Sequence, residues 1–176
     1  MPAQSEHTLA GVAKWLVSQL PQLCGVQTSS NSPDGSVIIE LSSRVSNIRF
    51  DPSSKTLSFV WNRTLKAHGP DGSELELPAF YEKRGNLTEH VSINLSAINP
   101  NAAKVVDSSD LKTKQLWEVQ LGSGNSRAFV LNGNELGRIN LKYFQSKEDA
   151  AQVRRAFMDA ANLAGASTGY TPDTSQ

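Results

Sequence analysis

The spacing of apolar residues predicts a helix near each end of the chain. The first helix is predicted over residues 8–20, because apolar residues recur there every three or four positions and Pro21 interrupts the pattern. In the second helix Ser146 occupies an N-cap position, Asp149 follows three residues later, and Gly165 provides a stop signal. The apolar stripes are Leu9, Val12, Ala13, Leu16 and Leu20 in the first helix, and Ala150, Val153, Phe157, Ala160, Ala161 and Ala164 in the second.

Between these helices the apolar residues alternate with polar ones, which predicts about seven strands in a meander. The turn at Asp51–Lys55 predicts a hairpin, and Gly122–Asn125 predicts a second hairpin between the strands on either side of it. Residues 27–35 are rich in Ser, Asn, Pro and Asp and are predicted to form a loop. The candidate strands are Val37–Leu41, Arg44–Asp51, Thr56–Thr64, Glu74–Tyr81, Thr88–Leu95, Leu116–Leu121, Arg127–Leu131 and Gly137–Phe144.

These elements predict one α+β domain over residues 8–165, with flexible termini at 1–7 and 166–176. We expect an antiparallel, strongly bent sheet or a small barrel, closed at one opening by the C-terminal helix through Val153 and Phe157. The N-terminal helix is expected to pack outside it. The residues predicted to lie in the core or at its margin are Phe50, Phe59, Trp61, Ile93, Trp117 and Phe129.

Two parts of the chain resemble a known superfold. The first is the opening stretch 8–20 with Leu23-Cys24-Gly25, and the second combines Leu116–Leu121, Asn140–Phe144 and Glu148–Phe157. They are similar to the opening helix and the closing segment of bacterial pleckstrin-homology-like domains. The resemblance implies a bent sheet closed by a C-terminal helix. It also implies a role in binding, because this superfold is used chiefly to bind phosphoinositides, peptides or other proteins.

The resemblance does not extend to a lipid-binding site. Lipid-binding members carry a basic cluster in their first hairpin, whereas the Asp51–Lys55 turn offers only Lys55, opposed by Asp51. The chain as a whole has 17 Lys and Arg against 17 Asp and Glu, so no net field attracts nucleic acid or an anionic membrane. We therefore expect no nucleic-acid partner, and the missing basic cluster argues against a lipid-headgroup ligand.

The sequence also bears on the compartment. No apolar run approaches the roughly 20 residues of a transmembrane helix. The N-terminus lacks the charged start and apolar run of a secretory signal, which favours the cytoplasm as the sequence stands. Similar domains are often exported, and a periplasmic domain whose signal has been removed would show the same N-terminus. Both compartments stay open.

Candidate chemistry is sparse. Cys24 is the only cysteine and is expected to be a small buried residue, because nothing in the sequence ties it to one of the three histidines as a base. No clustered metal ligands or phosphate-binding glycine loop occurs. The aromatic and basic stretch 61–66 contains the candidate ligand-binding residues Arg63 and Lys66, since aromatic and cationic groups together can bind a partner. The alternative is that both are simply solvated.

These observations predict a non-enzymatic binding or protein-interaction module that needs no cofactor and takes a protein or peptide partner, for example along an open sheet edge. Two alternatives stay open. One is a small-molecule carrier or enzyme whose pocket forms only in three dimensions. The other is a structural domain that tethers part of an envelope complex. The sequence leaves the oligomeric state undetermined.

Overall fold

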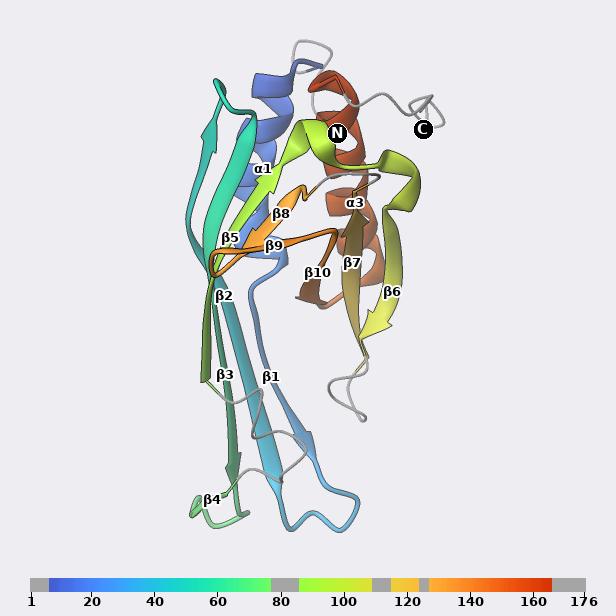
Figure 1. Ribbon diagram of the computed structural model, residues 1–176. Coiled ribbons are helices and arrows are strands. Elements are labelled where there is room, and N and C mark those ends of the chain that lie inside the picture. The colour runs from blue at the N-terminus through green and yellow to red at the C-terminus, as the bar shows by residue number, and fades with distance from the viewer. Residues whose placement is uncertain (1–6, 77–85, 109–114, 124–126, 166–176) are drawn as a thin grey trace.

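The computed structural model describes residues 7–76, 86–108, 115–123 and 127–165. These residues form two antiparallel sheets and two long helices, α1 (Leu9–Leu23) and α3 (Lys147–Leu163), which lie side by side (Figure 1). The α+β class, the two terminal helices and a large antiparallel sheet are therefore confirmed. The described strands do not close into a barrel.

The large sheet has seven strands, ordered β1-β2-β3-β5-β8-β9, with β4 pairing to the far end of β3. Two long central strands, β2 and β3, extend well past the helices in Figure 1 and carry β1 and β4 beside their far ends. The strands are β1 (Val26–Asn31), β2 (Ile38–Asp51), β3 (Thr56–His68), β4 (Glu74–Leu75), β5 (Asn86–Asn94), β8 (Phe129–Leu131) and β9 (Asn134–Leu136).

The small sheet is ordered β10-β7-β6, with strands β6 (Lys104–Ser108), β7 (Leu116–Gly122) and β10 (Arg138–Phe144). Short 3-10 helices at Leu95–Ala97 and Pro100–Ala102 lead from β5 into β6. The predicted hairpin across Gly122–Asn125 is wrong. Strand β7 pairs with β6 and β10, whereas β8 pairs with β5 and β9, because the longer apolar strand β10 is the better partner for β7.

The structure differs from the predicted strands and loops in three further places. Residues 27–35 do not form the expected loop, since β1 covers most of them and its six consecutive pairs with β2 outweigh their weak strand propensity. The candidate strands Val37–Leu41 and Arg44–Asp51 are one strand, β2, with one extra residue between Ser46 and Arg49. Strand β6 has no counterpart among the candidate strands.

Most of the candidate strand Glu74–Tyr81 lies outside the described residues, as do residues 1–6 and 166–176.

The helix boundaries follow the capping residues. Ser146 Oγ accepts a 3.0 Å hydrogen bond from the N–H of Asp149, and Gly165 has a φ of +95°, as its role after a helix requires. The first helix does not end before Pro21 but continues to Leu23. Pro21 has no N–H to donate within the helix, but the helical pattern continues past it, since the N–H of Cys24 bonds to the carbonyl of Leu20.

The core lies between the large sheet, the small sheet and the two helices. Val153 and Phe157 of α3 are fully buried, as predicted. The residues predicted for the core or its margin are also confirmed. Phe59, Trp61, Ile93 and Phe129 are buried, while Phe50 and Trp117 are partly buried against the core.

Candidate functional site

The terminal strands of the two sheets differ in how far their edges are protected. Natural proteins protect edge strands by shortness, charge, proline or bulges, because an open edge can pair with another chain. Strand β9 is three residues long, and its Glu135 forms an ion pair of 2.6 Å with Arg127. Strand β6 carries Lys104 and Asp107, and Asp107 accepts a hydrogen bond from Gln115. Both edges are therefore protected.

The edge of β10 is protected in a different way. One extra residue interrupts its pairing with β7, and Tyr143 at this bulge has a φ of +73°. The thiol of Cys24 donates a hydrogen bond of 3.0 Å to the carbonyl of the preceding residue, Lys142. This carbonyl is thus already engaged, and the strand also carries the charges of Arg138 and Lys142.

Strand β1 has none of these protections. Its six residues, Val-Gln-Thr-Ser-Ser-Asn, include no charge, no proline and no glycine, and all six pair with β2 without a bulge. Gln27, Ser29 and Asn31 are exposed. In a terminal antiparallel strand alternate residues direct their N–H and C=O groups away from the sheet. Among the described residues no strand pairs with the outer side of β1, which is therefore a regular, open edge.

A short turn holds β1 in register with β2. Asp34 accepts hydrogen bonds from the hydroxyls of Ser32 (2.6 Å) and Ser36 (2.7 Å) and from the N–H of Ser36 (3.0 Å). These bonds, led by the one from the Ser32 hydroxyl, lower the pKa of the Asp34 carboxyl to about 2. The N–H of Ser32 also bonds to the carbonyl of Val37. The edge strand is thus fixed at the end where it turns into β2.

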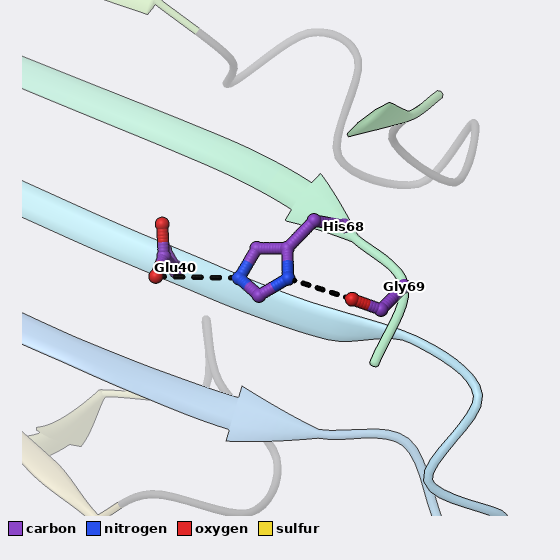
Figure 2. Close-up of polar contacts among 3 residues, drawn as sticks. All are labelled: Glu40, His68 and Gly69. Carbon is purple, nitrogen blue, oxygen red and sulfur yellow. Dashed lines mark hydrogen bonds and ion pairs between the residues drawn. The ribbon is translucent and has the colours of Figure 1, made fainter. Parts of the chain in front are cut away.

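An ionisable pair, Glu40 and His68, joins β2 and β3 beside this edge strand. Figure 2 shows His68 of β3 between Glu40 of β2 and the carbonyl of Gly69, with Nε2 at 3.3 Å from the carboxylate and Nδ1 at 3.0 Å from the carbonyl. Both ring nitrogens face acceptors, so both donate when the ring is protonated. The bond to Gly69, followed by that to Glu40, raises the pKa of His68 above its ordinary value of 6.5.

The structure does not bring the two candidate ligand-binding residues together. Lys66 is exposed on the outer face of β3, opposite Glu40 in register. Arg63 is an odd number of residues away on the same strand, so it lies on the inner face. There its Nη1 donates a 2.7 Å hydrogen bond to the hydroxyl of Tyr143, and its guanidinium lies 5.7 Å from that ring's centre. Their role in binding stays a prediction.

Cys24 is buried, as predicted. Burial raises the pKa of its thiol to about 12, so the sulfur is not a nucleophile at neutral pH.

Within the described ranges no three His, Cys, Asp or Glu side chains gather as metal ligands. In the same part of the chain, neither helix has the length and hydropathy that a membrane span requires.

Comparison with protein-family models, with curated proteins and with solved structures found no match to this chain. The interpretation of the site therefore depends on its geometry.

Sequence reasoning missed the open edge, because β1 contains no alternating apolar residues. The one signal it offered was a six-residue stretch without charge, proline or glycine that includes Val26 and Thr28, both of which favour strands.

Proposed function

We propose that the protein is a non-enzymatic interaction module that binds an extended segment of a partner protein along β1. The observation that carries this proposal is the contrast between β1 and the other terminal strands. Strands β6, β9 and β10 are short, charged or bulged, whereas β1 is regular and uncharged. A partner strand would pair its backbone with the outward N–H and C=O groups of β1 and extend the large sheet by one strand.

We further propose a relation to the pleckstrin-homology-like superfold. It is supported by the order of elements at the C-terminus, where a sheet strand, β10, is followed directly by the buried helix α3. The relation adds to the binding hypothesis only as a structural analogy.

Selection of displayed random peptides on the immobilised protein tests the proposed site, because it requires no identified partner. We expect the selected peptides to bind the wild type and Ser42→Lys alike and to bind Ser29→Lys roughly tenfold more weakly or worse, a difference of about 1.4 kcal/mol. The two serines are both exposed on the outer face, but Ser29 belongs to the edge strand and Ser42 to its neighbour β2. Peptides that bind all three proteins equally would contradict the proposal.

A second copy of the chain could also be the partner. In that case light scattering would show a dimer for the wild type and for Ser42→Lys, and a monomer for Ser29→Lys. A twofold antiparallel pairing would bring the two introduced lysines close together, and their repulsion would oppose it. A dimer that survives Ser29→Lys would place the self-association elsewhere and would count against β1.

A further inference from the structure

The outer face of the large sheet contains a hollow at the bulge of β2. One extra residue lies between Ser46 and Arg49, and Asn47 has a φ of +52°. Bulges bend a strand and redirect its side chains, and they are frequent beside functional sites. The hollow has a volume of about 690 Å³. Its lining residues are Asn47, Ile48, Arg49, Ser58, Phe59, Val60, His90, Val91 and Ser92.

The strand register shows how these residues are arranged. Arg49 of β2 pairs with Ser58 of β3, and Ser58 pairs with Ser92 of β5. In the next row Val60 pairs with His90. Since neighbouring strands lie about 4.8 Å apart, Arg49 and His90 flank a floor about 10 Å wide. Ser58 and Val60 form that floor, and the Ser58 hydroxyl is 3.2 Å from that of Ser92.

No described residue neutralises the charge of Arg49. Arg49 makes neither a hydrogen bond nor an ion pair with any of them, and none of the described residues that line the hollow is a carboxylate. The acidic residue nearest along the strand, Asp51, is engaged in the adjoining turn. It accepts hydrogen bonds from the hydroxyls of Ser53 (2.7 Å) and Ser54 (2.8 Å). Arg49 is therefore available to an external anion.

His90 is held in place by its backbone. Its N–H donates a 2.8 Å hydrogen bond to the side-chain carbonyl of Asn132, and its carbonyl accepts one of 2.9 Å from the N–H of Asn132. These bonds fix the strand at that point and leave the exposed imidazole at the margin of the hollow. The imidazole therefore borders the hollow on the side away from Arg49.

We propose that this hollow binds a small organic ligand with an oxyanion at one end and an apolar body. The guanidinium of Arg49 binds the oxyanion, either a carboxylate or a phosphate, because its donors match the geometry of both. The side chain of Val60 contacts the apolar body, and His90 borders the opposite side. This site is separate from the edge of β1 and does not depend on the proposed function.

Titration followed by amide NMR tests the site, with butyrate, butyl phosphate and n-butanol as probes. We expect shifts for residues 47–49, 58–60 and 90–92 with one or both anions and not with the alcohol. The anion that binds more tightly identifies the class of ligand. Arg49→Gln should weaken that binding roughly tenfold or more, because a charge-assisted hydrogen bond is lost.

Arg44→Gln is the matched control, because Arg44 is exposed on the outer face of β2 but does not line the hollow. It should bind the anions as the wild type does. The proposal would be overturned by equal shifts with the alcohol, by equal loss in the two arginine variants, or by the absence of shifts with every probe. Thermal melting of both variants verifies that they are folded, which is expected for substitutions at exposed positions.

Discussion

The hydroxyl of Tyr143 accepts a 2.7 Å hydrogen bond from the guanidinium of Arg63, and this contact joins the small sheet to the large one. The Tyr143 ring also lies 6.0 Å from that of Trp61, whose Nε1 donates a 2.6 Å hydrogen bond to the hydroxyl of Ser43. Tyr143 is buried and has a left-handed backbone conformation, which is unusual for an aromatic residue. This junction therefore holds the bulge of β10 in place.

Removing the hydroxyl should weaken this junction. Tyr143→Phe keeps the ring but leaves a partly buried guanidinium without this acceptor, so we expect the free energy of unfolding to fall by about 1.5–3 kcal/mol. Urea denaturation measures the change. A Tyr143→Phe protein as stable as the wild type would show that the contact contributes nothing to the joining of the two sheets.

The helix α3 provides a matched pair of substitutions. Phe157→Asp places a charge without a partner in the core, so we expect it to unfold the domain or to cost about 4 kcal/mol or more. Leu163→Asp, on the same helix at a position that is 40 % exposed, should change stability much less. Circular dichroism during heating compares them. A folded Phe157→Asp protein with an unchanged melting temperature would refute the position of α3 in the core.

Cys24 should be inert in the folded protein. Burial raises the pKa of its thiol to about 12, and only the thiolate reacts with iodoacetamide. We expect negligible labelling at pH 8 under native conditions and complete labelling in denaturant, measured by mass spectrometry. Rapid labelling of the native protein would show that the thiol is accessible and would contradict its burial.

The pair Glu40–His68 should make the far end of the large sheet sensitive to pH. The pKa of His68 is raised in the folded state, chiefly by the bond to Gly69 and then by Glu40. The protonated imidazole of His68 therefore stabilises the fold. This contribution is fully present below the unfolded pKa of about 6.5 and is lost as the pH rises through the higher folded pKa. NMR titration of the imidazole measures this. Glu40→Gln should lower the pKa of His68, and an unchanged value would exclude the carboxylate as a cause.

Local signals in the sequence predict the elements whose ends depend on nearby residues. The helix α3 is predictable because Ser146, Asp149 and Gly165 act at its two ends through their immediate neighbours. The bulge of β2 also leaves a signal in the sequence. Between Val45 and Ile48 the apolar residues of the strand change from odd-numbered to even-numbered positions. The same change is expected where one strand ends and another begins, so it does not identify a bulge. The hollow beside Arg49 is consequently missed.

The remaining features depend on contacts between distant parts of the chain. Strand β1 forms because β2 offers it a partner, and its own serines and threonines give no apolar alternation to detect. The partner of β7 is β10 rather than β8, a choice that local turn sequences do not determine. Arg63 and Tyr143 are 80 residues apart, so their contact could not be predicted from spacing.

The central claim is that β1 is the surface on which a partner binds. Its most direct test is affinity capture from a lysate of the source organism with the wild type, Ser29→Lys and Ser42→Lys, followed by quantitative mass spectrometry. We predict a specific partner that is retained by the wild type and Ser42→Lys and lost with Ser29→Lys, while the three proteins melt at similar temperatures. A partner captured equally by all three, or no partner at all, would contradict the claim.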